Sequence, residues 1–507
     1  MSPASDRYEV VIGLEVHTHL KTKSKLFSPA PVSYGDAPNH NTHFVDLALP
    51  GVLPVLNAEV IDLAIRLGLA THSTVNERSV FSRKNYFYPD LPKGYQISQY
   101  EEPIVEHGWI EVEVPADGGG AGGGKKGKKK GKGAEAEPEL KRIGITRAHL
   151  EEDAGKSIHD MAVAGGDESY IDLNRAGVPL LEIVSEPDMR SATEAVAYLR
   201  ALRSILRYIG VSDADMEKGQ FRCDANVSLR PRGQAEFGTR TEIKNLNSFA
   251  SVEAAIKAEI VRQGEILDDG GEIVQATMGF DPNKKRTKVQ RLKENADDYR
   301  YFDDPDLIPL LIDPGRIEAV RASLPELPAE KRARFESEHG LSGYDAGVLT
   351  ASRTLADYFE ATVAAGAPAK TAANWIARDV IKVLKERDAE IEDVALPADG
   401  LAKLIGLVED GRLTARSAQD LLPELLEQGG DPEAIMTERG LEAVSDSGVI
   451  DGVVDEVIAN NADGVANVKA GDDKPLNFLM GQVMKATQGK ANPAEVRAAL
   501  IAKIRGA

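Results

Sequence analysis

The chain lacks three features that would each define a class of protein. Cys223 is the single cysteine among 507 residues, so an internal disulfide framework is excluded and a reducing compartment is favoured. No apolar run approaches the ~20 residues of a membrane span, and no signal peptide is recognisable. We therefore expect a cytoplasmic protein.

Common catalytic motifs are missing as well. The sequence has no GxGxxG that opens a helix, no HExxH, no CxxC pair and no GxSxG elbow. Residues 119–126 come close to a P-loop, but Lys126 stands where a Ser or Thr would bind the metal. A cysteine-dependent glutaminase would have to use Cys223, which falls on the apolar face of its segment. The chain is a poor candidate for hydrolysing an amide by itself.

Basic residues are too few for wholesale electrostatic binding of nucleic acid. The chain has 81 acidic and 61 basic residues and a net charge of −20. Such binding needs basic surface, which here is limited to local patches. Hydrophobic residues make up 42% of the chain, enough for substantial cores in two to four domains.

The composition changes along the chain. Residues up to about 300 predict mixed strands and helices, whereas residues beyond about 315 predict mostly helices. The insert 116–139 holds nine Gly and six Lys and predicts a flexible surface loop. We expect an α+β protein with a domain at 1–300, a helical domain at 301–435 and a helical tail at 436–507.

Chemistry is concentrated first in a predicted strand at residues 10–20. One face is mostly apolar, and the other carries Glu15, His17 and His19. These three groups bind cations or move protons. The face predicts the floor of a site, and the alternative is an ordinary sheet with one wet face.

A second candidate is Glu182, which is the one charge in the apolar segment 178–184. A lone carboxylate in such a strand costs several kcal/mol unless it is paired or binds a cation. A buried salt bridge and a metal ligand are therefore the two interpretations. We favour the ligand because Glu15 and His17 also need a partner.

Two further segments carry clustered polar groups. Residues 143–159 combine adjacent acids with bases, which suits a metal with phosphate-binding cations nearby. The members of this cluster are Arg147, His149, Glu151, Glu152, Asp153, Lys156 and His159. Residues 221–230 alternate, and a second strand at about 239–246 predicts a hairpin with a polar floor. The polar face of the first of these strands carries Arg222, Asp224, Asn226, Ser228 and Arg230.

At these segments the chain resembles the B subunits of bacterial aspartyl/glutamyl-tRNA amidotransferases. The resemblance covers essentially the whole chain except the insert 116–139. It is carried by GLEVHTHLKTKSKLFSP (13–29), DLALPGVLPVLN (46–57), RKNYFYPDLPKGYQISQ (83–99), RIGITRAHLEEDAGKSIH (142–159), DLNRAGVPLLEIVSEPD (172–188), FRCDANVSLRP (221–231), EIKNLNSF (242–249), DDYRYF (297–302) and GQVMKATQGKANP (481–493).

The resemblance implies an ATP-dependent carbon–nitrogen ligase that uses glutamine as amido donor. Its substrates would be misacylated Glu-tRNA(Gln) or Asp-tRNA(Asn), whose side-chain carboxylate is phosphorylated with ATP and Mg2+ and then amidated. An amidase/glutaminase, the A subunit, would supply the ammonia, and a small C subunit would complete a heterotrimer. The implied fold is a mixed-sheet cradle, distantly similar to glutamine synthetase, followed by a helical domain and a small tRNA-binding tail.

The resemblance also assigns site residues. The implied catalytic and metal-binding set is Glu15, His17, Glu152 and Glu182. The implied phosphate-facing cations are Arg83, Lys84, Arg147, Lys156, Arg175 and Lys244, with Lys93 and Arg222 in matching motifs. Magnesium prefers oxygen ligands, so a histidine among three carboxylates suits Mn2+ or Zn2+ equally well. Two alternatives stay open, namely weaker binding by His17 and a second metal position.

Two other functions are compatible with parts of the sequence. One is a non-catalytic adaptor that presents tRNA to another enzyme, which suits the helical C-terminal part but leaves Glu15, His17 and Glu182 unexplained. The other is a stand-alone amide ligase that acts on a small free acid.

Overall fold

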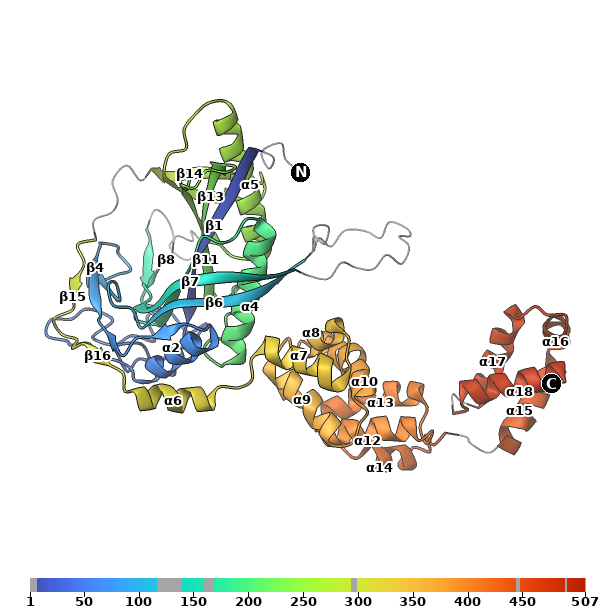
Figure 1. Ribbon diagram of the computed structural model, residues 1–507. Coiled ribbons are helices and arrows are strands. Elements are labelled where there is room, and N and C mark those ends of the chain that lie inside the picture. Colours follow the sequence, from blue (N-terminus) through green and yellow to red (C-terminus); the bar gives the residue numbers. More distant parts are fainter. Residues whose placement is uncertain are drawn as a thin grey trace. The chain divides into compact units, whose positions relative to one another are not determined.

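The structure is a computed structural model that divides into two compact units, Met1–Leu327 and Pro328–Ala507. It describes residues 7–115, 139–158, 168–292, 299–443, 447–487 and 490–506. The insert, apart from Glu139, and His159 lie outside the described residues. The predicted α+β class is confirmed, since a sheet-based unit precedes a helical one (Figure 1).

A 12-stranded mixed sheet is the frame of the first unit. Its main path runs β14-β13-β12-β11-β1-β10-β7-β5-β4-β15, and β6 pairs with β2 and β7. Every pairing is antiparallel except β12 with β13. The strands of this sheet are β1 (Tyr8–His19), β2 (Thr74–Val75), β4 (Ser82–Asn85), β5 (Tyr95–Ser98), β6 (Val105–Val114), β7 (Glu139–Glu152), β10 (Pro179–Ser185), β11 (Phe221–Pro231), β12 (Thr241–Leu246), β13 (Ala276–Asp281), β14 (Arg286–Leu292) and β15 (Phe302–Asp303).

Smaller elements complete this unit. Two short ladders join β16 to β3 and β8 to β9. Their strands are β3 (Arg78–Ser79), β16 (Leu310–Leu311), β8 (Lys156–Ile158) and β9 (Tyr170–Asp172), and the helices are α2 (Glu59–Ala70), α4 (Ala192–Tyr208), α5 (Phe249–Asp268) and α6 (Pro314–Ser323).

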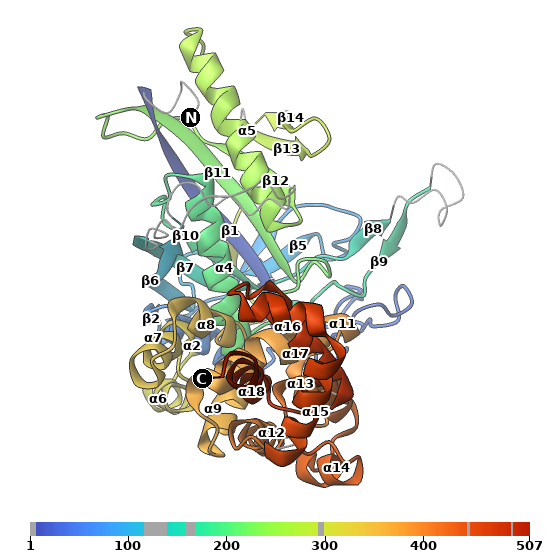
Figure 2. The same ribbon diagram turned by 90° about the vertical axis from the view of Figure 1, so that its right-hand side faces the viewer.

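The core lies on one face of the sheet, under the helices. Ile12, Leu14 and Val16 of β1 are buried there, as the alternation of this strand predicts. Helices α4 and α5 run along this face (Figure 2). Because side chains alternate along a strand, the polar side chains of the same strands lie on the opposite face of the sheet.

Local signals set the ends of these elements. Ser191 accepts a hydrogen bond from the Glu194 backbone N–H and caps the N-terminus of α4. The predicted hairpin is confirmed by the antiparallel pairing of β11 with β12. Cys223 is buried on the apolar face of β11, which confirms its expected place in the core.

The first unit extends beyond the expected boundary at residue 300. Phe302 pairs with Arg83 of β4, Leu310 pairs with Ser79 of β3, and α6 packs against α2. These contacts between distant segments tie residues 299–327 to the sheet. Composition alone placed the boundary too early because it carries no record of such contacts.

The second unit is helical. Its helices are α7 (Pro328–His339), α8 (Gly343–Leu349), α9 (Arg353–Ala364), α10 (Ala369–Asn374), a π-helical segment (Trp375–Val380), α11 (Ile381–Arg387), a 3-10 turn (Ile391–Asp393), α12 (Ala398–Glu409), α13 (Ala415–Gln428), α14 (Pro432–Glu438), α15 (Ser447–Asn460), α16 (Ala462–Lys469), α17 (Lys474–Ala486) and α18 (Pro493–Arg505). Helices α15 to α18 have a hydrophobic cluster of their own. The expected division at residue 435 stays a prediction. Within the described residues, no helix is long and apolar enough to cross a membrane.

A buried carboxylate fastens α5 to the edge of the sheet. Glu259 has no exposed surface and accepts hydrogen bonds from Thr241 of β12 and Thr287 of β14, both at 2.7 Å. Arg262 completes its coordination from the next turn of the helix. The two hydroxyl groups are themselves buried.

We expect Glu259→Ala to lower the free energy of unfolding by about 3 kcal/mol, because the two threonine hydroxyls lose their acceptor. Urea unfolding followed by circular dichroism measures this. The matched control is Glu265→Ala, an exposed glutamate of the same helix, which should change stability by less than about 0.5 kcal/mol. Equal effects of both substitutions would contradict this account.

Candidate cation-binding site

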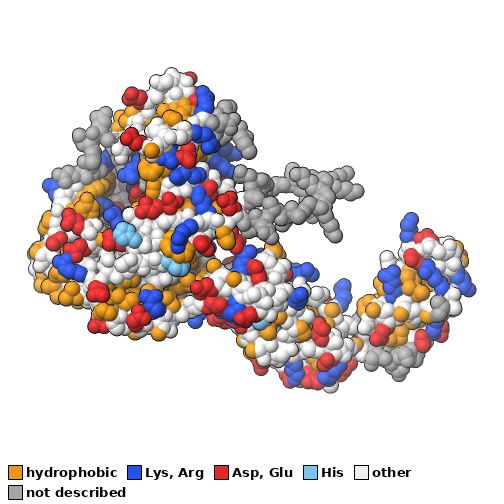
Figure 3. All heavy atoms as spheres, viewed as in Figure 1, with side chains coloured by type: hydrophobic (Ala, Val, Ile, Leu, Met, Phe, Trp, Pro, Cys, Tyr) orange, Lys and Arg blue, Asp and Glu red, His pale blue; other side chains and the backbone are white. Residues whose placement is uncertain are grey.

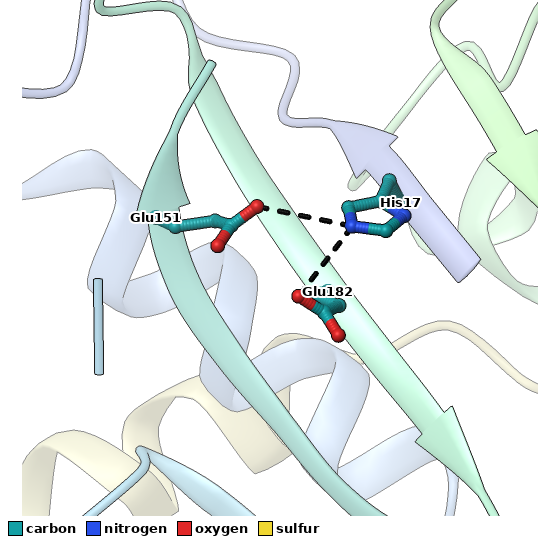
Figure 4. A group of neighbouring side chains, drawn as sticks. All are labelled: His17, Glu151 and Glu182. Atoms are coloured by element: carbon teal, nitrogen blue, oxygen red, sulfur yellow. Dashed lines mark ion pairs between the residues drawn. The ribbon is translucent and has the colours of Figure 1, made fainter. Parts of the chain in front are cut away.

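Three side chains from three adjacent strands meet on the polar face of the sheet. His17 of β1 lies opposite Glu182 of β10, and β10 pairs in turn with β7, which carries Glu151. The His17 Nε2 atom is 3.4 Å from Glu182 Oε2 and 3.9 Å from Glu151 Oε1 (Figure 4). One ligand atom from each residue falls within 4.8 Å of the other two, which is the spacing of a cation-binding group.

A second histidine lies beneath the two carboxylates. His149 pairs with Glu182 across the ladder, and its Nε2 is 3.3 Å from Glu182 Oε2 and 3.7 Å from Glu151 Oε2. Its side chain is only 4% exposed, and its Nδ1 has no hydrogen-bond partner among the described residues. Glu182 therefore stands between two imidazoles, with His17 on the more open side.

The charges of this group hold one another. Burial opposes the charged form of His17, but the hydrogen bond and the charge of Glu182 prevail and raise its pKa to about 9. Burial would raise the pKa of Glu182, yet His149 and His17 hold it well below its usual range. The protons on the two histidines thus balance the negative charge of the carboxylates. A cation that binds His17 Nε2 must displace the proton from that atom.

A second acidic group adjoins the first. Glu15 of β1, Asp224 of β11 and Glu242 of β12 place one carboxylate oxygen each within 4.8 Å of the other two. Asn226 donates to Glu15 Oε1 at 2.9 Å, and Lys244 is 2.9 Å from both Asp224 and Glu242. Burial raises the pKa of Glu15, and the charge of Glu182 in the first group raises it further. The two groups are therefore electrostatically coupled.

The donor sets fit divalent cations. Carboxylate oxygens are the ligands that Mg2+ prefers, and imidazole adds Mn2+ and Zn2+ to the range. The crowding that raises the Glu15 pKa is what a bound cation would relieve. His17, Glu151 and Glu182 would hold one ion, and Glu15, Asp224 and Glu242 a second.

The ligand set expected from the sequence is thus divided. His17 and Glu182 come together, but Glu15 belongs to the second group, and Glu152 belongs to neither. Successive side chains alternate across a strand, so Glu152 faces away from Glu151. Glu152 instead forms an ion pair with Lys93 and accepts a hydrogen bond from the Ile97 backbone N–H at 2.9 Å. For this reason Glu151, and not Glu152, is the neighbour of His17.

Some of the expected phosphate-facing cations do lie on the polar face of the sheet. Lys84 interacts electrostatically with Glu151 and Glu182, but no carboxylate of the described residues lies within 4.0 Å of its ammonium group. Its Nζ lies 4.9 Å from the centre of the Tyr299 ring. Arg147 is two residues before His149 on the same strand face, and its Nε has no hydrogen-bond partner in the described part of the chain. Lys244 is bound into the second acidic group.

Other expected cations are occupied elsewhere. Arg83 forms ion pairs with Asp304 and Asp306, both at 2.9 Å, so it holds the edge of the first unit together. Arg175 donates to the Ala154 and Gly155 carbonyls. Lys156 is exposed on β8. The prediction that these three bind a nucleotide gains no support from their contacts.

Asp153 organises the end of the site beside β1. It accepts from Arg222 at 2.6 Å and contacts His19 Nε2 at 2.7 Å, with Arg175 at 3.5 Å. Burial alone would raise its pKa, but Arg222 and Arg175 hold it far below the usual range. His19 is therefore a partner of Asp153 and joins neither acidic group.

The sequence pattern places His149 and Glu151 in a polar cluster that suits a metal without marking them as ligands, and it gives no sign of Glu242. A strict count of alternation from His149 would have paired it with Glu151 on one face of a strand. Glu242 carries no comparable signal, since only the pairing of β12 with β11 brings it to Asp224 and Glu15.

The fold and the site together define a class: an α+β protein whose sheet carries two adjacent carboxylate-rich groups that could each hold a cation. Two family models match the chain. The GatB/GatE catalytic domain covers residues 10–318, and the GatB domain covers residues 357–504.

Curated relatives match along nearly the whole length. Three proteins, from Geobacter sulfurreducens, Solidesulfovibrio magneticus and Neisseria meningitidis, are 51%, 51% and 50% identical to this chain. The alignments cover 98% of this chain and 100%, 99% and 99% of those proteins. Each is named as the B subunit of an aspartyl/glutamyl-tRNA(Asn/Gln) amidotransferase. The chain belongs to the family of these B subunits.

Single substitutions of carboxylates should distinguish the role of Glu151 from that of Glu152, its neighbour in sequence. We expect Glu151→Gln and Glu182→Gln each to weaken Mn2+ binding by about 100-fold, because each removes a charged ligand. Glu152→Gln should weaken it by less than about threefold, because this carboxylate faces Lys93. Titration calorimetry with Mn2+ measures all three. A larger loss for Glu152→Gln than for Glu151→Gln would contradict the observed division.

His149 should act through the carboxylates beside it. We expect His149→Ala to weaken Mn2+ binding by about tenfold, because the groups that orient ligands contribute 10-fold to 100-fold to metal affinity. His149→Gln should recover part of this loss, since its amide N–H can donate to Glu182. The comparison uses Mn2+ titration followed by electron paramagnetic resonance. Unchanged affinity in His149→Ala would show that the contact has no such role.

Proposed function

We propose that this chain phosphorylates the side-chain carboxylate of Glu-tRNA(Gln) or Asp-tRNA(Asn) with ATP and then amidates it with ammonia. The observation that supports this most directly is the pair of ligand groups on one strand, where Glu15 and His17 point from the same face of β1 into adjacent groups. Two divalent ions at such spacing suit the transfer of a phosphoryl group. The names of the relatives supply the substrate class.

The chemistry explains the need for ATP. A carboxylate is a poor acyl donor, since its leaving group would be oxide. In the proposed reaction a side-chain oxygen of the aminoacyl group bonds to the γ-phosphorus, and the bond from that phosphorus to the β,γ-bridging oxygen breaks, which releases ADP. The nitrogen of ammonia then bonds to the acyl carbon, phosphate leaves with the bonding electrons, and one proton is lost. The net products are the amide, ADP and phosphate.

The residues of this chain have separate tasks in that scheme. His17, Glu151 and Glu182 would hold one Mg2+ ion, and Glu15, Asp224 and Glu242 a second. Such ions supply positive charge that neutralises the transferring phosphoryl group. Lys84 and Arg147 provide further positive charge from the polar face of the sheet. Asn226 orients Glu15 through its 2.9 Å hydrogen bond. No side chain has to act as a nucleophile, in keeping with a site that lacks a reactive cysteine.

The assembly is part of the proposal. A glutaminase, the A subunit, would release the ammonia from glutamine, and a small C subunit would complete a cytoplasmic heterotrimer. Helices α15 to α18, which share one hydrophobic cluster, would form the tRNA-binding part of the tail 436–507. The distant similarity of the sheet unit to glutamine synthetase also belongs to this proposal.

The decisive experiment supplies the wild-type chain with ATP, Mg2+, ammonium chloride and Glu-tRNA(Gln). We expect ADP to form only when the misacylated tRNA is present, and hydroxylamine in place of ammonium to trap the activated carboxylate as a hydroxamate. Glu182→Gln should lower the rate of ADP formation by about 1000-fold, because the charges on the phosphoryl group are no longer balanced.

Two controls make the result specific. Glu265→Gln, on the exposed face of α5, should leave the rate unchanged. Uncharged tRNA(Gln) should give no ADP. The adaptor function would be supported instead if Glu182→Gln and Glu151→Gln retained full activity, and a free-acid ligase if free glutamate replaced the tRNA.

A further inference from the structure

The surface loop of residues 43–57 exposes an unusual number of apolar side chains. They are Phe44 (59% exposed), Leu47 (36%), Leu49 (44%), Leu53 (63%) and Val55 (75%). Together they present roughly 500 Å2 of apolar surface, close to the upper end for a lone soluble protein. Hydrophobic side chains gather along the lower edge of the first unit in Figure 3, where Figure 1 draws α2 and its neighbouring loops. We call residues 43–57 the apolar loop.

The apolar loop is rigid although its side chains are exposed. The Val55 and Asn57 backbone N–H groups donate to the Phe27 and Leu26 carbonyls, and Leu49 N–H donates to the Phe44 carbonyl. Ala48 and Gly51 adopt positive φ angles of 55° and 85°, which close the turns. These hydrogen bonds and turns define the backbone geometry of the loop, as a preformed binding surface requires.

A buried ion pair fastens the loop from below. Asp46 is 3.1 Å from Lys25 Nζ and accepts hydrogen bonds from the Ser28 hydroxyl and the His43 backbone N–H. Lys25 has no exposed surface and also donates to the Leu173 carbonyl at 3.3 Å. Asp46, the sole charged residue of the apolar loop, is therefore buried in the ion pair that supports the loop. It adds no charge to the outer surface of the loop.

The chemistry of the loop selects the kind of partner. Residues 47–58 contain no charged side chain, whereas 28% of the chain is charged. Without Lys or Arg the loop cannot neutralise phosphates, which argues against RNA and against an anionic membrane surface. Depletion of charge with exposed aliphatic and aromatic side chains is the composition of the centre of a protein interface.

We propose that the apolar loop is the surface on which the ammonia-delivering glutaminase subunit of the amidotransferase docks, through an uncharged apolar face of its own. This inference rests on the proposed function, which requires a subunit that delivers ammonia. A stable interface buries about 800 Å2 on each partner, so the apolar loop would form most of its centre. The support of the loop also reaches the site, because Gly177 donates to the Asp153 carbonyl and accepts from the Leu26 N–H.

The test uses the full chain and the purified A subunit, the glutaminase of the same assembly. In the double variant Leu53→Asp/Val55→Asp, two carboxylates would have to be buried without partners. We expect the Kd for the A subunit, measured by titration calorimetry, to rise by about 100-fold. Tyr344→Asp is the matched control, since Tyr344 is 78% exposed on α8 of the other unit, and its Kd should stay within about threefold of wild type.

Two further measurements decide between occupants. Light scattering of the chain alone would overturn the proposal if it showed a dimer that the double variant abolishes, as would vesicle binding that the double variant abolishes. An unchanged Kd in the double variant would overturn it too. Failure of the proposed function has a separate signature: the wild-type chain would form no ADP from ATP, ammonium chloride and Glu-tRNA(Gln). Normal Mn2+ affinity in the double variant would show that its site is intact.

Discussion

The structure depends on one interaction, the contact of the buried Glu182 carboxylate with two histidines from neighbouring strands. His17 and His149 approach the same oxygen from either side, at 3.4 and 3.3 Å. A buried carboxylate without such partners would cost several kcal/mol, and with them it becomes one corner of a candidate cation site. The register of β1, β10 and β7 creates this contact, so the ladder that builds the sheet also builds the site.

A sheet tolerates so many charges on one face because its other face is apolar. Helices α4 and α5 bury Leu14, Val16 and their neighbours, and this burial offsets the repulsion among Glu15, Asp224 and Glu242. Side chains on paired strands are also held more precisely than side chains on loops. The proposed reaction, which has to position phosphates and an acyl group, would gain from that precision.

The chain separates its tasks by element. The polar face of the sheet carries the ligand groups, the apolar loop carries exposed uncharged side chains, and α15 to α18 have their own core. The two family models, at residues 10–318 and 357–504, fall within the two structural units. The extra residues of the first unit, up to Leu327, are held by pairings with β3 and β4 and by packing on α2.

The sequence by itself determined the family and the strands that carry the site, because motifs and alternation are local patterns. It also placed His17 and Glu182 in one site, since a lone charge on an apolar strand needs a partner. Only the tertiary structure decided that Glu151 rather than Glu152 joins them. It also decided that Glu15 belongs to a second group with Glu242, and that Arg83 forms ion pairs with Asp304 and Asp306. The reason is physical: a neighbour across a ladder is set by register between distant strands, and a single strand carries no record of its register.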